Sequence, residues 1–545
     1  MMIKKLLVTV LFITQLAHSQ NTVGNIQITD DVFEGYTLFT VSTESYLINN
    51  CGQVINQWSS GFPPGNAVYL MENGNLLRAG RTNSSDISFG GQGGVVEMYN
   101  WEGNLIWQYF YDTPEVRQHH DVFPMPNGNI LILAATRMTN AEAIQAGRNP
   151  VLLTETDLYN ERIIEVTPLN FSEATIVWEW NINDHLVQDF DNTKDNFGDV
   201  SLSPNRLDIN FLNGGIGGSN WLHINSIQYN EALDQIVLSS RNLSEIYIID
   251  HSTTTAEAAS STGGLYGKGG DFLYRWGNPQ SYDQGTEADR ILYGQHYPYI
   301  IQSGFIDEGK IILFNNGNGR SPSFSEAMII NPPISSPGVY TYTPGMAFGP
   351  TAADYIYTDP MDQSNFFSHI LSSAQRLPNG NTLICEGTSG RFFEISPSED
   401  IAWEYIHPIN SNSGSIANQG DDSNTFQNYS FRANKYPTDY AAFTGRDLTP
   451  GDPIELNFNL DPCNELLNLN ELTEDNTTFT PNPTKGILNI NTSNNISKIE
   501  VYNALGSKLI ETTTKFIDLS DYEDGMYFLK VFSNDKVLSK KIIKI

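Results

Sequence analysis

The chain has 545 residues, of which 39% are hydrophobic and 17% charged, so it can bury one large core and still hold a smaller domain. Its net charge of −32 repels phosphate backbones and argues against nucleic acid as a partner. The same charge repels free anions at long range, so any anion site has to be an enclosed, local cluster of donors.

The first residues have the pattern of an export signal. Lys4 and Lys5 precede an apolar run from Leu6 to Ile13, and residues 17–19 fit a cleavage site of small residues. The apolar run is too short to span a bilayer, and no later segment is long enough. We therefore predict a signal peptide over residues 1–19 and no membrane span.

Residues 20–462 contain a repeat of four short strands. Each unit begins with a short strand that leads into a turn, usually Asn-Gly, and a second apolar strand follows. A third apolar strand and a fourth strand ending on tryptophan complete most units. The five complete units begin at Asn66, His120, His223, His296 and Ser372.

The two ends of this region together supply one more unit. Residues 36–58 match the second, third and fourth strands, and we expect no first strand before them. A lone strand candidate, Asn428 to Tyr436, can provide the missing strand and close a ring without an open sheet edge. The sequence therefore predicts an all-β fold, a six-bladed β-propeller closed by both termini. A seven-bladed ring and a pair of β-sandwiches are the alternatives.

The pattern changes at the C-terminal end. A polar, acidic linker over residues 463–478 precedes strand candidates that predict a small C-terminal β-sandwich over residues 479–545. The stretches PNPTKG, VYNALGSKL, LSDYEDGMYFLKV and KKIIKI resemble the C-terminal sorting domain of the type IX secretion system of Bacteroidetes. The resemblance implies export through the periplasm by the type IX secretion machinery to a secreted or cell-surface location. A small adhesive or carbohydrate-binding sandwich is the alternative.

The cysteines give no sign of a metal site. Cys51, Cys385 and Cys463 lack the spacing of metal ligands. At most one disulfide can form, and Cys51 with Cys463 is a candidate pair.

Several histidines share one position of the repeat. In a propeller the first strand of each blade lines the central channel, and His120, His223 and His296 begin three consecutive units. His119 is one residue out of register. Arg241 follows the second strand of the unit that begins at His223, and its planar guanidinium matches a tetrahedral oxyanion.

Three kinds of chemistry compete for this cluster. Zinc or copper could take three imidazoles, but a cationic arginine beside a metal is unfavourable. Acid–base chemistry of the glycosidase kind needs two facing carboxylates, and no unit begins with one. Covalent catalysis at a neutral histidine, with cationic donors holding the transferred group, uses every residue found. We expect neither a metal nor a cofactor.

Six stretches resemble the bacterial arylsulfate sulfotransferases across most of residues 33–445. They are HHD (119–121), WLHINS (221–226), LSSR (238–241), GQH (294–296), FNNG (314–317) and FRANKYP (431–437). The resemblance implies a six-bladed propeller that moves sulfate from a phenolic sulfate ester to a phenol acceptor without a nucleotide sulfate donor. The lack of a P-loop motif is consistent with this.

The same resemblance implies a role for each site residue. His296 attacks the sulfur and forms a transient sulfohistidine in a ping-pong cycle. Arg241 and His223 hold the sulfuryl oxygens, and either can protonate the departing phenolate. His120 completes the ring of site residues, and Asn225 contacts the donor. A sulfatase or lyase acting on sulfated glycans and a non-catalytic binding propeller remain as alternatives, and the oligomeric state stays open.

Overall fold

The computed structural model describes residues 21–461 except 85, 216 and 217, residue 463, and residues 478–545 except 493–495, 504–507, 534 and 535. The predicted signal peptide and positions 464–477 of the predicted linker lie outside the described residues. The chain divides into two compact units, residues 1–459 and residues 460–545.

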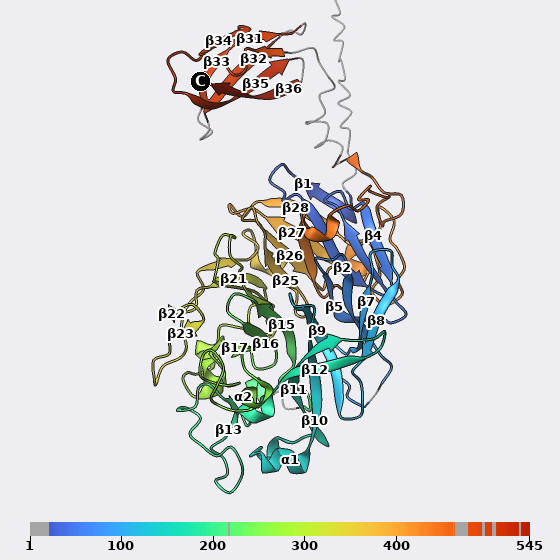
Figure 1. Cartoon of the computed structure of the whole chain (residues 1–545), viewed down its shortest axis with the longest axis vertical. Coiled ribbons are helices and arrows are strands. Elements are labelled where there is room, and N and C mark those ends of the chain that lie inside the picture. The colour runs from blue at the N-terminus through green and yellow to red at the C-terminus, as the bar shows by residue number, and fades with distance from the viewer. Residues whose placement is uncertain are drawn as a thin grey trace, which may run out of the picture. The chain divides into compact units, whose positions relative to one another are not determined.

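Antiparallel sheets of four or five short strands build the described part of the larger unit (Figure 1). Sheet one contains β29 (Ala433–Pro437), β2 (Gly35–Val41), β3 (Glu44–Ile48) and β4 (Val54–Ser59). Sheet two contains β5 (Pro64–Leu70), β6 (Leu76–Arg81), β7 (Gly94–Tyr99) and β8 (Leu105–Phe110). Sheet three contains β9 (Val116–Pro124), β10 (Ile130–Thr139), β11 (Asp157–Pro168) and β12 (Ala174–Asn181).

The remaining three large sheets of this unit follow the same order. Sheet four contains β15 (Ile224–Asn230), β16 (Gln235–Ser240), β17 (Glu245–Asp250) and β18 (Tyr274–Trp276). Sheet five contains β19 (His296–Ile300), β20 (Ile311–Asn315), β21 (Glu326–Ile330) and β24 (Tyr355–Tyr357). Sheet six contains β25 (Ser373–Arg376), β26 (Thr382–Glu386), β27 (Arg391–Ile395), β28 (Ile401–Ile406) and β1 (Gly24–Ile28).

Short elements occupy the connections between these strands. They are the helices α1 (Asn140–Gln145) and α2 (Thr255–Ala258) and the paired strands β13 (Leu186–Val187), β14 (Leu207–Asp208), β22 (Ile334–Ser336) and β23 (Val339–Tyr340). Within the described residues, every helix is too short or too polar to cross a bilayer.

Both ends of the larger unit pair with distant strands. β29 pairs with β2, which confirms the prediction that a C-terminal strand completes the N-terminal sheet. The strand β1, which was not predicted, precedes this sheet and pairs with the outer edge of β28 in sheet six. Figure 1 shows β1, in blue, beside β28, in orange. This short strand has no apolar run of its own and is held by the edge of sheet six, which it covers.

The first strands of successive sheets contact one another. β5 contacts β9, β9 contacts β15, β15 contacts β19, β19 contacts β25, and β25 contacts β29. The series returns to its start through Asn434, whose side-chain amide donates to the carbonyl of Val68 on β5 at 3.4 Å. The histidines that begin three of the predicted units therefore lie on or directly before neighbouring first strands.

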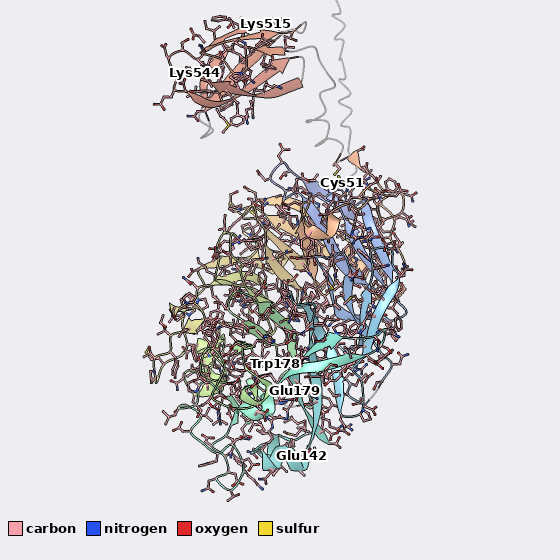
Figure 2. All side chains as sticks on the ribbon, viewed as in Figure 1. Cys51, Glu142, Trp178, Glu179, Lys515 and Lys544 are labelled. Carbon is pink, nitrogen blue, oxygen red and sulfur yellow. The ribbon has the colours of Figure 1, made fainter. Side chains whose placement is uncertain are left out.

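Tryptophans on the outer strands link five of the six large sheets to the next sheet. The indole N–H of Trp58 donates to Asn100, that of Trp107 to Glu173, that of Trp180 to Gly270, that of Trp276 to Pro350 and that of Trp403 to Asn50, all at backbone carbonyls. Trp178 (Figure 2) is 4% exposed and donates to the hydroxyl of Thr253. These bonds explain why the fourth strand of most units ends on tryptophan.

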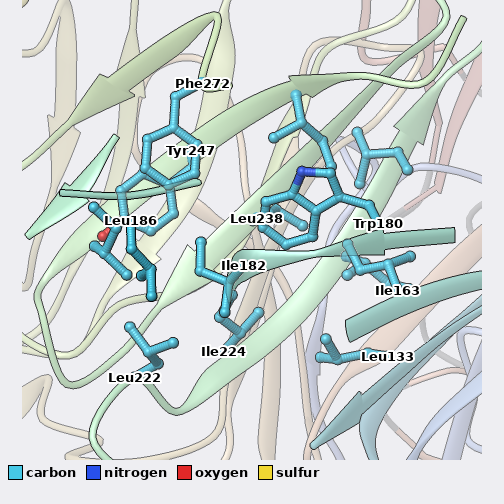
Figure 3. Packing of buried hydrophobic residues seen from close by; sticks show 14 of the residues in the cluster. Leu133, Ile163, Trp180, Ile182, Leu186, Leu222, Ile224, Leu238, Tyr247 and Phe272 are labelled. Carbon is cyan, nitrogen blue, oxygen red and sulfur yellow. The ribbon is translucent and has the colours of Figure 1, made fainter. Parts of the chain in front are cut away.

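A large apolar core lies between sheets three and four (Figure 3). Leu133 and Ile163 of sheet three share this cluster with Leu238 and Tyr247 of sheet four. Ile224 belongs to the same cluster and directly follows His223 in the chain. Burial of Ile224 therefore fixes the backbone that carries this histidine.

The C-terminal unit has two sheets around one core. One contains β30 (Thr478–Thr480), β31 (Ile487–Asn491) and β34 (Phe516–Asp518). The other contains β33 (Lys508–Thr512), β32 (Lys498–Asn503), β35 (Gly525–Ser533) and β36 (Lys536–Lys544). Leu488, Val501 and Leu529 contribute to the buried cluster that these strands share.

The cysteines differ in state. Cys51, labelled in Figure 2, and Cys463 are each disulfide-bonded, whereas Cys385 is a free, buried thiol. Burial raises the pKa of the Cys385 thiol, so this side chain is unreactive.

Candidate active site

The predicted histidines lie where first strands leave regular pairing. His120 and His223 have left-handed backbone conformations, with φ of 48° and 49°. Such conformations cost about 1–3 kcal/mol in residues other than glycine and are concentrated at functional sites. The β9–β10 and β15–β16 pairings both contain irregularities next to these histidines. A β-bulge of this kind redirects a side chain away from the regular face of its sheet.

Sheet five differs slightly from its neighbours. There the left-handed residue is Tyr297, with φ of 53°, and His296 precedes it. The β19–β20 pairing is irregular between His296 and Tyr299. His296 therefore occupies the predicted position in the repeat but is placed by a different local backbone from that of His120 and His223.

The imidazoles lie close together and are flanked by aromatic rings. The rings of His120 and His223 have centroids 4.7 Å apart and meet edge to face. The ring of Phe431 lies 6.2 Å from that of His120 and 6.2 Å from that of His296. Phe89 lies 6.1 Å from His223. His120 and His296 are each only 3% exposed, so the cluster is shielded from bulk water.

Arg241 provides positive charge beside the cluster. Its backbone N–H donates to the carbonyl of His223 at 3.1 Å, and its Nη1 donates to Oδ1 of Asn242 at 3.1 Å. No carboxylate forms an ion pair with it in the described part of the chain. Burial lowers the pKa of this guanidinium, but arginine stays charged at neutral pH. A partly buried cation without a counter-ion favours an anionic ligand.

Burial and charge keep the imidazoles neutral. Burial, followed by the charge of Arg241, lowers the pKa of His296 to about 3. The same two causes hold the pKa of His223 well below its usual range. Burial and then the neighbouring His223 and His119 lower the pKa of His120 in the same direction. All three rings are therefore uncharged near pH 7.

Asn316 determines which nitrogen of His296 carries the proton. Its Oδ1 lies 2.6 Å from Nδ1 of His296. Its Nδ2 donates to the carbonyls of Ser368 at 2.7 Å and Leu371 at 2.9 Å, which fixes the orientation of the amide. An oxygen can only accept, so Nδ1 of His296 must donate. The neutral ring therefore has its lone pair on Nε2, the nitrogen that a nucleophile needs.

His223 has the opposite arrangement. Nδ2 of Asn220 lies 2.6 Å from Nδ1 of His223, so Nδ1 accepts and Nε2 carries the proton. A neutral Nε2–H is a hydrogen-bond donor suited to an oxyanion. At Nε2, His223 thus presents a hydrogen-bond donor and His296 presents a lone pair.

His120 belongs to a chain of buried hydrogen bonds. Its Nδ1 lies 2.9 Å from Nδ1 of His119, and Nε2 of His119 lies 2.8 Å from Oε2 of Glu161. The other oxygen of Glu161 accepts the backbone N–H of Ile224 at 3.0 Å. The first strands of sheets three and four are therefore connected through this carboxylate.

Arg432 lies nearby but is already neutralised. It pairs with Asp121 at 2.9 Å, and both side chains are at most 2% exposed. Tyr69 donates to Asp121 at 3.1 Å and also contacts Arg432. The carboxylates of Glu161 and Asp121 are thus bound to His119 and Arg432, which leaves Arg241 as the uncompensated cation among these groups.

Asn225 is completely buried, and its Nδ2 donates to the carbonyl of Gln295 at 2.8 Å. Its Oδ1 is buried without a hydrogen-bond partner. Asn225 therefore braces the backbone just before His296, and its contact with a donor molecule stays a prediction. Across the described residues, no group of histidine, cysteine, aspartate and glutamate side chains is arranged to hold a metal ion.

The family of the chain follows from comparison with known proteins. Residues 42–432 match the arylsulfotransferase (ASST) family model, and residues 478–545 match the secretion system C-terminal sorting domain. The chain belongs to the arylsulfotransferase family. No curated protein matches the chain.

Solved structures similar to this arylsulfotransferase family member have low sequence identity. A Bacteroides caccae protein of unknown function is 10% identical, with a TM-score of 0.37, over 74% of this chain and 98% of its own. A Staphylococcus aureus virginiamycin B lyase is 10% identical, with a TM-score of 0.33, over 73% and 91%. A Pseudomonas aeruginosa periplasmic gluconolactonase is 9% identical, with a TM-score of 0.36, over 77% and 98%.

The structure of this arylsulfotransferase family member also shows site residues that sequence reasoning missed. Asn316 lies within the FNNG stretch and His119 within HHD, so both were in recognised motifs without an assigned role. Asn220 directly precedes the WLHINS stretch. Glu161 lies in no such motif, and its contact with His119 joins residues 42 positions apart in the chain.

Proposed function

We propose that this chain transfers a sulfuryl group from a phenolic sulfate ester to a phenol acceptor, through a sulfohistidine on His296 and without a nucleotide donor. The observation that carries the proposal is the state of His296. It is a buried, neutral imidazole whose Nδ1–H is fixed by Asn316, and the unpaired Arg241 lowers its pKa. Family membership supplies the reaction class.

We place this site in the central channel of a six-bladed propeller. Three features support the closed ring: the strand order of the sheets, the successive contacts between first strands, and the tryptophan bonds that connect neighbouring sheets. In such a ring the first strands line the channel. The residues before and within β9, β15 and β19 then face the axis together.

In the first half-reaction, Nε2 of His296 attacks the sulfur of the donor. A nitrogen–sulfur bond forms, the sulfur–oxygen bond to the aryl group breaks, and the electron pair leaves on the phenolate. Arg241 and the Nε2–H of His223 donate to the sulfuryl oxygens. The imidazole of His296 becomes positively charged, and its Nδ1–H is held by Oδ1 of Asn316. Each fixed donor of this kind contributes about 10²–10³-fold to rate.

In the second half-reaction, the oxygen of a phenol acceptor attacks the same sulfur. The nitrogen–sulfur bond breaks, and its electron pair returns to Nε2 of His296. His120 completes the set of groups around the transferred sulfuryl, and Asn225, which holds the Gln295 carbonyl just before His296, contacts the donor. Phe89 and Phe431, whose rings flank the histidines, suit an aromatic donor and acceptor.

We further propose that the protein is exported. The C-terminal sorting domain supports delivery by the type IX secretion machinery to the cell surface or the medium. In this proposal residues 1–19 are the signal peptide, residues 20–462 the catalytic propeller, residues 463–478 a linker and residues 479–545 the sorting domain.

The test is release of 4-nitrophenol from 4-nitrophenyl sulfate by the full chain, with and without added phenol. Wild type, His296→Ala and the control His369→Ala, an exposed histidine, are compared in the presence and absence of EDTA. Phenol-stimulated release that His296→Ala abolishes and EDTA does not affect supports the proposal. Release that is independent of phenol indicates a sulfatase, and no release with any phenol indicates a binding propeller.

A further inference from the structure

His119, Glu161 and His120 form a continuous buried chain that the transfer steps above do not use. The distances are 2.8 Å from Glu161 to His119 and 2.9 Å from His119 to His120. His119 is fully buried, the Glu161 side chain is 2% exposed, and His120 is 3% exposed. The imidazole of His120 is in turn 4.7 Å from that of His223, between ring centroids. A buried carboxylate–histidine–histidine chain that ends at the site is a path for a proton.

The proton on His119 has two alternative positions. Glu161 is a carboxylate acceptor at Nε2 of His119, and its other oxygen is occupied by the N–H of Ile224, so Nε2 of His119 donates. The two facing Nδ1 atoms of His119 and His120 share one proton. When that proton is on His120, Nε2 of His120 has a lone pair and can act as a base. When His119 holds it, Nε2 of His120 carries a hydrogen and can act as an acid.

We propose that Glu161 and His119 are a proton relay that makes His120 the general acid and then the general base of sulfuryl transfer. This rests on the proposed function. In the first half-reaction Nε2–H of His120 protonates the departing phenolate, and the proton between the rings moves from His119 to His120. In the second, the acceptor phenol gives its proton to Nε2 of His120, and the proton between the rings returns to His119. One proton leaves with the first phenol and one arrives with the second, so the cycle balances.

The surroundings of His120 explain why it needs a relay. The titratable and charged groups that act on His120 are His119, His223, His296 and Arg241, and none of them carries a negative charge. Burial and these groups lower the pKa of His120, so a free imidazolium is not available there as an acid. In the relay the acid form holds its positive charge on His119, against the carboxylate of Glu161, and His120 itself remains neutral throughout.

Glu161→Gln tests the relay because it keeps the shape of the side chain and removes its negative charge. The glutamine oxygen still accepts from Ile224, so its amide nitrogen faces His119 and donates. His119 is then neutral, with its single proton on Nδ1, and His120 carries its proton on Nε2. His119 cannot pass on its single proton without becoming an anion, so Nε2–H of His120 no longer acts as an acid. The matched control is Glu165→Gln, which changes another buried glutamate of β11 that pairs with a histidine, His251, outside the site.

The first readout is kcat/KM for two donors that differ in leaving group. General acid catalysis contributes about 10²–10⁴-fold, and it is needed most for a poor leaving group. We expect Glu161→Gln to lower kcat/KM with phenyl sulfate by about 10²-fold or more and with 4-nitrophenyl sulfate by less than about tenfold. Glu165→Gln should change neither. An equal loss with both donors would show that Glu161 only supports the structure.

The second readout does not require turnover. Nitrogen-15 chemical shifts of labelled histidines in the full chain report which nitrogens of His119 carry protons, with His119→Gln used for assignment. The relay predicts protons on both nitrogens of His119 in the resting wild type and on Nδ1 alone in Glu161→Gln, with the proton of His120 on Nε2 in both. The same protonation of His119 in both proteins would overturn the relay even if wild type transfers no sulfate, whereas the predicted difference without turnover would leave the relay standing and reject the proposed function. If Glu161→Gln does not fold, His119→Gln replaces it in the donor comparison with the same expected selectivity.

Discussion

Oδ1 of Asn316 lies 2.6 Å from Nδ1 of His296, and this single contact determines which nitrogen of the imidazole carries the proton. Because both N–H groups of the Asn316 amide are bound to carbonyls, the oxygen has only one way to face. The imidazole then presents a lone pair on Nε2. In the proposed reaction the nucleophile is therefore prepared by a neutral amide rather than by a carboxylate.

Asn316→Ala should remove this control. Without the acceptor, His296 can hold its proton on either nitrogen and rotate, and misplacement of a reacting group costs about 10²-fold in rate. We expect kcat to fall by about this factor with little change in KM for the donor. Steady-state kinetics on 4-nitrophenyl sulfate with phenol measure both constants. An unchanged kcat would mean that another contact orients the imidazole.

Arg241→Met should remove the uncompensated charge that we propose holds the sulfuryl oxygens. Loss of one such donor costs about 10²–10³-fold in kcat. Arg241→Lys should recover only part of the activity, because a lysine lacks the planar fork. Arg446→Met, outside the cluster, is the control. Full activity of Arg241→Lys would show that charge alone suffices.

The pH profile should show that His296 remains a base in acid. Its pKa is lowered to about 3, so the lone pair on Nε2 is lost only when the pH falls through that value. An unperturbed histidine would lose it near pH ~6.5. We expect no fall in kcat/KM for the donor between pH about 7 and about 4, with circular dichroism at each pH to check that the protein is folded. In Arg241→Met the acid-side fall should move to higher pH. An inflection near pH ~6.5 in wild type would contradict this assignment.

Gly91→Ala should disable the site without unfolding the protein. A Cβ at this position would lie 2.0 Å from Cε1 and Nε2 of His120, so the imidazole would have to move. Gly128 has nearly the same backbone conformation, with φ of +87° against +86°, but open space around it. Gly128→Ala therefore controls for backbone strain. We expect similar changes in Tm for both variants, with activity lost only in Gly91→Ala.

Arg432→Met should destabilise the protein strongly. It leaves Asp121 as a buried carboxylate without its cation, a change that typically costs about 3–5 kcal/mol. Adding Asp121→Asn should recover part of the loss, because the uncompensated charge is then gone. Denaturant unfolding of wild type, both single variants and the double variant measures the coupling. Losses that simply add would show that the two side chains act independently.

The sequence predicted the parts of this structure that repeat. The four-strand units, the C-terminal strand that completes sheet one, and the shared position of His120, His223 and His296 all follow from local patterns. Strand β1 was not predicted, because its pairing with β28 depends on an edge that only the folded chain provides. The residues that set the protonation of the histidines were missed for a related reason. Glu161 reaches His119 from 42 positions along the chain, a separation that no local motif encodes.

The most direct test of the account is to trap the intermediate. The full chain is mixed with 4-nitrophenyl sulfate without acceptor, quenched at alkaline pH and analysed by intact-mass and peptide mass spectrometry. The account predicts one added sulfuryl group on His296, which disappears when phenol is added and is absent from His296→Ala. A sulfuryl group on another residue, or phenol sulfation without any modified histidine, would contradict it.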